Sequence, residues 1–146
     1  MMELPKILLA SLTAGIITQV FKFVRASWRG NVQWHMLNRY GGMPSAHTAF
    51  VASLTTAIGI SEGIDSPIFA VVFILSAIIV RDAIGFRRYL GTHGRMLNML
   101  VRELPQSEAL KFPNRLDEKV GHTPLEALVG GLIGVAISSL YFMFIF

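Results

Sequence analysis

The sequence predicts an all-α integral membrane protein, a four-helix bundle with a short interfacial amphipathic helix between its third and fourth spans. Three observations support this prediction. Hydrophobic residues make up 53% of the 146 residues and charged residues only 15%, whereas soluble domains usually carry about 25% charged residues. Four long apolar stretches alternate with polar connections, and the basic residues gather in two of these connections. The competing interpretation is a soluble all-α bundle with buried helices.

The four spans belong to a single predicted domain, residues 1–146, and lie at about 7–24, 44–60, 67–84 and 125–146. A helix that crosses a bilayer needs about 20 mostly apolar residues. The last stretch meets this requirement, because it carries no charged side chain from Ala127 onward. The other three have shorter uncharged runs, but Lys and Arg near a helix end can extend to the interface. The first stretch shows no convincing cleavage site, which argues against a signal peptide.

The distribution of charge predicts the orientation. The connections after the first and third spans are basic, whereas the link between the second and third, "SEGIDS", carries only Glu62 and Asp65. Because basic loops stay in the cytoplasm, we expect a bacterial-type inner (plasma) membrane protein with both termini outside. The formal net charge of +4 suits anionic lipid or a phosphorylated substrate, and no nucleic-acid partner is expected.

The third connection contains the predicted amphipathic helix. In "THGRMLNMLVREL", residues 92–104, apolar residues recur at helical spacing opposite a polar side. This pattern predicts a helix that lies in the cytoplasmic interface or packs on the bundle. The following "KFPNRLDEKVG" is a polar connection.

Two polar segments open the second and fourth spans: "GGMPSAHTAF", Gly41 to Phe50, and "GHTPLEALVGG", Gly121 to Gly131. Each places a glycine, a proline and a histidine at a helix N-terminus, where unpaired N–H groups and the helix dipole bind phosphate. The predicted topology puts both segments on one side, together with Lys22 at the end of the first span. Arginines at the end of the third span lie there too: Arg81, Arg87 and Arg88. This convergence favours phosphoryl chemistry on a membrane-bound substrate.

Each feature also has a purely structural explanation. Thr123 and Glu126 form a T-x-x-E capping box, and the basic residues could anchor the bundle at anionic headgroups. His122 and Glu126, four residues apart, could chelate a metal ion together. No third ligand stands at a diagnostic spacing, so no metal site is expected.

The order of these motifs resembles that of the type 2 phosphatidic acid phosphatase superfamily: K-x6-R-P, then P-S-G-H, then S-R-x5-H-x3-D. Lys22 and Arg29 stand at K-x6-R spacing, "PSAH" ends at His47, and His122 and Glu126 give H-x3-E. Together, "GGMPSAHTA", "DAIGFRR" and "GHTPLE" resemble the divergent branch of that superfamily, small membrane proteins related to acid phosphatases and vanadium-dependent haloperoxidases.

The chain departs from the superfamily pattern at four positions. Gly30 replaces the proline of the first motif, Ala46 replaces the glycine of the second, and Glu126 replaces the final aspartate. Leu116 stands six residues before His122, where the superfamily has an arginine.

By analogy, the missing arginine is assigned to "DAIGFRR" at the end of the third span. Arg88 is the first choice and Arg87 the second, with Asp82 as a further site candidate.

Carried over residue by residue, the resemblance implies a phosphatase that forms a phosphohistidine. His122 would attack phosphorus, Glu126 would hold its imidazole in the useful tautomer, and His47 would protonate the leaving alkoxide. The phosphate would be bound by helix N–H groups and by a set of side chains: Ser45, Lys22, Arg88, and Arg29 or Arg87. Since these cations supply the electrostatic role of a metal, no metal and no cofactor are expected.

A cytoplasmic site would act on lipids made on the inner leaflet, and members of the divergent branch include phosphatidylglycerophosphate phosphatases. The first choice of reaction is therefore dephosphorylation of phosphatidylglycerophosphate to phosphatidylglycerol. Undecaprenyl pyrophosphate or another polyprenyl or lipid phosphate is the alternative substrate. A non-enzymatic anionic-lipid-binding protein or small transporter is a further alternative, although transport sites favour the bilayer midplane. Expected partners are the anionic phospholipid substrate and membrane lipids, and a homo-oligomer stays open.

Overall fold

A computed structural model describes residues 3–28, 42–112 and 114–145 of the chain. The described part is built from helices joined by turns and loops. In chain order these are α1 (Glu3–Trp28), α2 (Ala46–Glu62), α3 (Pro67–Ile84), α4 (Phe86–Glu103), α5 (Gln106–Ala109) and α6 (Pro124–Phe144). The predicted all-α fold class is confirmed.

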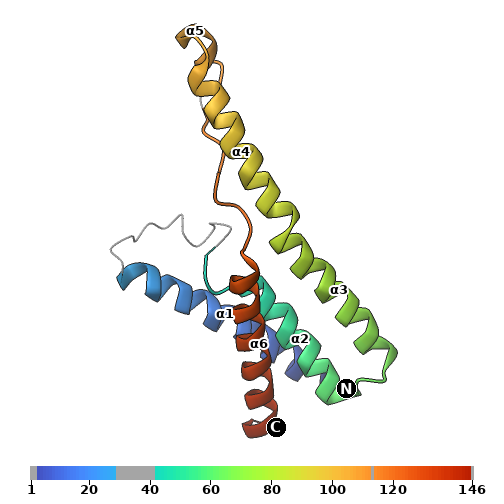
Figure 1. Ribbon diagram of the computed structural model, residues 1–146. Coiled ribbons are helices and arrows are strands. Elements are labelled where there is room, and N and C mark those ends of the chain that lie inside the picture. Colours follow the sequence, from blue (N-terminus) through green and yellow to red (C-terminus); the bar gives the residue numbers. More distant parts are fainter. Residues whose placement is uncertain (1–2, 29–41, 113, 146) are drawn as a thin grey trace.

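Helix α2 is the centre of the bundle, because it contacts α1, α3 and α6 (Figure 1). Helix α1 also packs on α6, and α3 continues into α4, which projects beyond the other helices as an arm. Both ends of the chain lie at the end of the bundle opposite this arm (Figure 1). The four predicted apolar stretches therefore form one helical bundle.

Three helical segments of the described chain are long and apolar enough to cross a membrane: Pro5–Arg25, Pro67–Glu103 and Pro124–Phe144. Helix α2 has 17 residues and is about 26 Å long at 1.5 Å per residue, slightly less than the ~30 Å hydrocarbon core. The membrane helical bundle is thus confirmed, whereas α2 as a fourth complete span stays a prediction.

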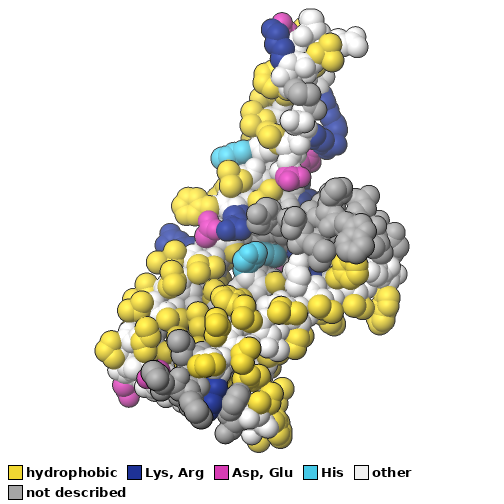
Figure 2. All heavy atoms as spheres, turned by 180° about the vertical axis from the view of Figure 1, so that it is seen from behind, with side chains coloured by type: hydrophobic (Ala, Val, Ile, Leu, Met, Phe, Trp, Pro, Cys, Tyr) yellow, Lys and Arg dark blue, Asp and Glu magenta, His cyan; other side chains and the backbone are white. Residues whose placement is uncertain are grey.

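Small residues set the distance between the central helices. On α6, Gly130 and Gly134 lie so close to α2 that an added Cβ would overlap the carbonyl oxygens of Ser45 and Ala49. On the α1 side, Ser53 of α2 donates a hydrogen bond of 3.3 Å to the Ala10 carbonyl. Because lipid tails are as apolar as leucine, membrane helices associate through such close packing and through hydrogen bonds between helices. Large apolar side chains cover much of the outer surface of the bundle (Figure 2).

The amphipathic helix of the third connection is α4, and it is longer than the predicted segment. It begins at Phe86 instead of residue 92, because hydrogen bonding carries on across Gly85, whose N–H donates to the Arg81 carbonyl at 2.9 Å. In Figure 1, α4 continues the direction of α3 rather than crossing the end of the bundle. Its position in the membrane interface stays a prediction.

The connection after α5 returns along one side of α4. Gly91 and Gly94 are buried there, and a Cβ on either would come within 2.7 Å of a carbonyl oxygen of Glu118 or Asp117. Asn98 clamps the same segment: its amide donates to the Leu116 carbonyl at 2.8 Å and accepts from the Leu116 N–H at 3.0 Å. This packing guides the chain back to the start of α6.

Candidate active site

The predicted site residues meet at the end of the bundle from which the arm projects. There α1 ends, α2 and α6 begin, and α3 passes into α4. Figure 2 shows histidine, basic and acidic side chains in a band between the apolar bundle and the arm.

Gly121 and His122 dock on the junction of α3 and α4. Gly121 has a φ of +86°, and a Cβ at this position would lie 2.7 Å from the Arg88 nitrogen. The N–H of His122 donates to the Ala83 carbonyl at 2.9 Å. The residue before the histidine must therefore be a glycine, both for its backbone conformation and for this close approach.

The His122 imidazole faces a carboxylate from the first turn of α6. His122 is 7% exposed, and its Nδ1 lies 3.4 Å from Glu126 Oε2. This distance exceeds that of an ordinary N–H···O hydrogen bond, and Nδ1 has no hydrogen-bond partner in the described part of the chain. The contact nevertheless directs Nδ1 toward Glu126 and leaves Nε2 as the nitrogen for chemistry.

The same oxygen of Glu126 closes the capping box of α6. Glu126 Oε2 accepts the Thr123 N–H at 3.0 Å, and Thr123 Oγ1 accepts the Glu126 N–H at 3.2 Å. Helix capping and contact with His122 are therefore compatible roles of one side chain.

Burial lowers the pKa of His122 below its usual value of 6.5, and the charges of Lys22 and His47 lower it further. The Glu126 carboxylate acts in the opposite direction. Because burial is the largest cause, the imidazole is held mainly in its neutral form at neutral pH.

Ser45 joins the two motifs at the start of α2. It is completely buried, and its N–H donates to the Glu126 carbonyl at 3.1 Å. Its hydroxyl caps α2 by accepting the Thr48 N–H at 3.3 Å and also accepts the Thr48 hydroxyl at 2.9 Å. The predicted phosphate contact of Ser45 would have to be made beside these hydrogen bonds.

Lys22 and Arg87 bring positive charge to His47. The charges of both residues act on the exposed His47 side chain. Lys22 Cε lies beside Gly42, where a Cβ would come within 3.2 Å of it. Arg87 forms an ion pair with Asp82, in which Arg87 Nε lies 2.7 Å from Asp82 Oδ2.

The two arginine candidates of the third motif are placed differently. Arg87 is the arginine of this pair whose charge reaches His47, whereas the Arg88 side chain is exposed. Which of the two arginines binds the phosphate stays a prediction. Arg29, the remaining predicted phosphate ligand, lies outside the described residues.

Sequence reasoning gave no positioning role to three residues: Arg25, Gly121 and Asn98. Arg25 donates to the Met43 carbonyl at 3.4 Å and so ties α1 to the segment before α2. Its spacing from Lys22, one helical turn, was a usable signal. Gly121 could also have been found as the glycine before a site histidine, but nothing local points to Asn98.

Among the described residues, no three His, Asp or Glu side chains gather closely enough to hold a metal ion. The polar groups that do gather are two histidines, the cations Lys22 and Arg87, and two carboxylates, of which Asp82 pairs with Arg87 and Glu126 faces His122.

A model of the divergent PAP2 family matches residues 5–137. The chain belongs to the divergent PAP2 family. It is also 36% identical over 142 residues to the uncharacterized membrane protein YuiD of Bacillus subtilis (strain 168), with 90% of each chain covered. No solved structure matches the chain. Membership of the divergent PAP2 family confirms the resemblance seen in the motifs, and the relative together with the apolar helices shows a membrane protein.

Proposed function

We propose that this protein is a lipid phosphate phosphatase that needs no metal and acts through a phosphohistidine at His122. The observation that supports this most directly is the setting of His122, a buried imidazole with Glu126 at Nδ1 and with Lys22 and His47 as charged neighbours. Membership of the divergent PAP2 family supports a phosphatase-type hydrolase.

In the first step, Nε2 of neutral His122 attacks the phosphorus and the ester P–O bond breaks. The leaving alkoxide takes a proton from the imidazole of His47, whose protonated form must be favoured by the bound anionic phosphate, because the charges of Arg87 and Lys22 act against it. Glu126, whose Oε2 lies 3.4 Å from Nδ1, would move closer to accept the Nδ1–H and stabilise the positive charge that develops on the ring. The products of this step are phosphohistidine, the lipid alcohol and neutral His47.

In the second step, neutral His47 takes a proton from a water molecule whose oxygen attacks the phosphorus. The P–N bond breaks, orthophosphate leaves, and His122 is again neutral. His47 has regained the proton that it gave in the first step, so the cycle is balanced.

Positive charge around His47 would stabilise the phosphoryl group during both steps. Lys22 and Arg87 supply two cations, and the first-turn N–H groups of α2 supply hydrogen-bond donors. Such fixed cations and donors stabilise the charge that spreads over the phosphoryl oxygens in the transition state.

The favoured substrate is phosphatidylglycerophosphate, which would be converted to phosphatidylglycerol at the cytoplasmic face. Two points support it: the basic connections favour a cytoplasmic site, and a terminal monophosphate reaches a site at headgroup depth. Undecaprenyl pyrophosphate and other lipid phosphates are the competing substrates within the same chemistry.

The test is phosphate release by the purified protein from phosphatidylglycerophosphate, phosphatidate and undecaprenyl pyrophosphate, each in EDTA. We expect phosphatidylglycerophosphate to be turned over fastest and His122→Ala to abolish turnover. His93→Ala is the matched control, because His93 is an exposed histidine of α4. A wild-type protein that releases no phosphate from any of the three lipids would overturn the proposal.

A further inference from the structure

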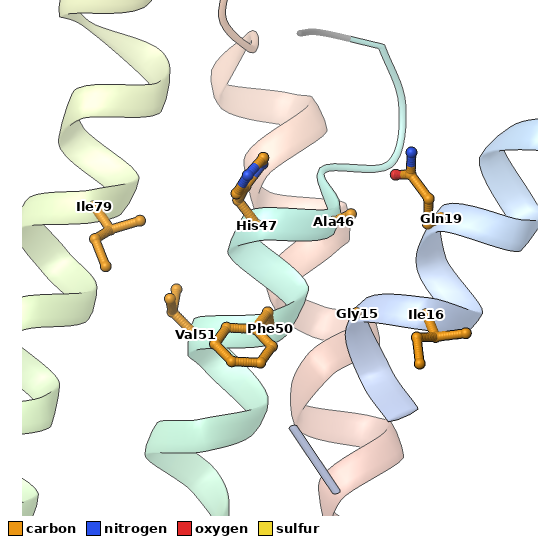
Figure 3. A pocket seen from close by; sticks show the side chains of 8 residues that line it. All are labelled: Gly15, Ile16, Gln19, Ala46, His47, Phe50, Val51 and Ile79. Atoms are coloured by element: carbon orange, nitrogen blue, oxygen red, sulfur yellow. The ribbon is translucent and has the colours of Figure 1, made fainter. Parts of the chain in front are cut away.

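A groove of about 540 Å³ opens on the outer face of α2, between α1 and α3 (Figure 3). Phe50 and Val51 of α2 and Ile79 of α3 form its apolar part. In Figure 3, His47 and Gln19 lie toward the same end of the groove, on either side of Ala46. The groove therefore begins at a residue of the candidate active site.

The polarity of the groove changes along its length. At the His47 end, Lys22 lies three residues beyond Gln19 on α1, and the charges of Lys22 and Arg87 act on His47. Toward the other end the lining is hydrocarbon. A ligand that matches both ends carries an anionic group joined directly to an apolar chain. Alkyl and polyprenyl phosphates have this form, whereas in phosphatidylglycerophosphate the headgroup separates the terminal phosphate from the acyl chains.

The length of the groove limits how much of such a chain it can hold. The lining runs from His47 to Val51 on α2 and from Gln19 to Gly15 on α1, which is about 6 Å along each helix. Gly15 keeps the α1 side open, because a Cβ there would reach within 3.5 Å of the Phe50 ring. Only the first methylene groups would fit, and the rest of the chain would continue into the bilayer beside exposed side chains such as Ile16.

We propose that this groove binds the first methylene groups of the hydrocarbon chain of an alkyl or polyprenyl phosphate, so that the phosphate is delivered to His47 sideways from the bilayer. The inference rests on the proposed function for the chemistry at its polar end. Hydrocarbon gains little free energy on moving from lipid to an apolar groove. The contribution of the groove is therefore orientation of the phosphate ester at the two histidines, an effect that can change rates strongly.

The kinetic test compares dodecyl phosphate with glycerol 3-phosphate at fixed detergent concentration. Ile79→Trp fills the groove, and we expect it to lower kcat/KM for dodecyl phosphate about tenfold more than for glycerol 3-phosphate. Ile74→Trp is the matched control, since Ile74 lies on the same helix, is 60% exposed and does not line the groove. If Ile79→Trp does not fold, Gly15→Leu fills the groove from α1. An equal effect of groove filling on both substrates would overturn the inference.

A binding test separates the groove from the chemistry. The His122→Ala protein is irradiated with a dodecyl phosphate that carries a diazirine near its phosphate, and the labelled residues are identified by mass spectrometry. We expect labelling at Ile16, Phe50 and Ile79 well above that at Ile74, and loss of this labelling in Ile79→Trp. Groove labelling together with an inactive wild-type protein would support the groove while rejecting the phosphatase. Uniform labelling of all lipid-facing residues would overturn the groove even if the wild-type protein is an active phosphatase.

Discussion

Glu126 carries two interactions on one oxygen atom, and substitutions can separate them. Glu126→Gln retains a side-chain acceptor for the Thr123 N–H, since glutamine also serves in a capping box, but it loses the charge beside His122. If the carboxylate supports the histidine, turnover should fall about 100-fold, by analogy with the loss of a triad carboxylate, with little change in thermal stability. Both quantities are measured on the same purified protein.

Thr123→Ala is the matched control for the cap. It removes the hydroxyl that accepts the Glu126 N–H and should cost about 1 kcal/mol of stability with activity mostly retained. Full activity in Glu126→Gln would show that Glu126 is only a cap.

The lowered pKa of His122 predicts the pH dependence. Because the pKa of His122 is lower in the folded state than in the unfolded state, the unfolded chain binds the proton more readily. The stability that His122 contributes is therefore present above pH 6.5 and is lost as the pH falls through the folded-state pKa. The acidic limb of kcat/KM should therefore lie below pH 6.5. Because Glu126 raises the pKa of His122, Glu126→Gln should move this limb to a lower pH on the same substrate. A limb that stays in place would contradict the pairing of the two residues.

The open choice between Arg87 and Arg88 shows a limit of sequence reasoning for single residues. Adjacent residues on a helix point about 100° apart, so the phase of the helix decides which one faces the site. Gly85, with φ −105° and ψ −90°, resets that phase between α3 and α4. The motif "DAIGFRR" contains both arginines but carries no information about this rotation.

At the level of elements, the loop before α6 is held by Gly121, and a second glycine gives a matched control. Gly121→Ala would force a side chain into a positive φ and into the Arg88 backbone, whereas at Gly63, with φ +84°, a Cβ meets nothing within 4 Å. Each change should cost about 1 kcal/mol or more in backbone strain. Only Gly121→Ala should also displace His122, so we expect it to lower kcat at least about tenfold, as measured by phosphate release. Equal activity in the two variants would contradict the positioning role of Gly121.

The starts of α3 and α6 could be predicted from the sequence, because helix capping depends on residues that are close together in the chain. Thr123 with Glu126 and Pro67 at the start of α3 are such signals, and the structure places helix starts at both. The return of the chain along α4 could not be predicted, because Asn98, Gly94 and Gly91 contact residues far along the chain: Leu116, Asp117 and Glu118. In the sequence, Asn98 looks like part of the polar side of an amphipathic helix.

For the whole molecule, the gathering of the two motifs and Lys22 at one end followed from the order and parity of the apolar stretches. The arm could not be predicted in the same way, because its length depends on hydrogen bonding across Gly85 and not on hydropathy. The orientation of the bundle in the membrane remains a prediction from the basic connections.

Single cysteines test that orientation cleanly, because the chain has none of its own. Asp65→Cys and Asn114→Cys place them at exposed positions, and Asp65 is preferable to Ser66, whose hydroxyl caps α3. A membrane-impermeant maleimide should label residue 65 from outside intact cells and residue 114 only after the membrane is opened. If both cysteines are labelled from outside, the site is not shown to be cytoplasmic, and the choice of phosphatidylglycerophosphate loses the support that it takes from a cytoplasmic site.

The central claim is that His122 carries the phosphoryl group. The most direct measurement mixes the purified protein with ³²P-labelled phosphatidylglycerophosphate, quenches in alkali within the first turnover and maps the label. The proposed mechanism predicts an alkali-stable, acid-labile phosphate on the peptide that contains His122, absent in His122→Ala and present in His93→Ala. Release of labelled orthophosphate with no label on the protein, or with the label on another residue, would contradict it.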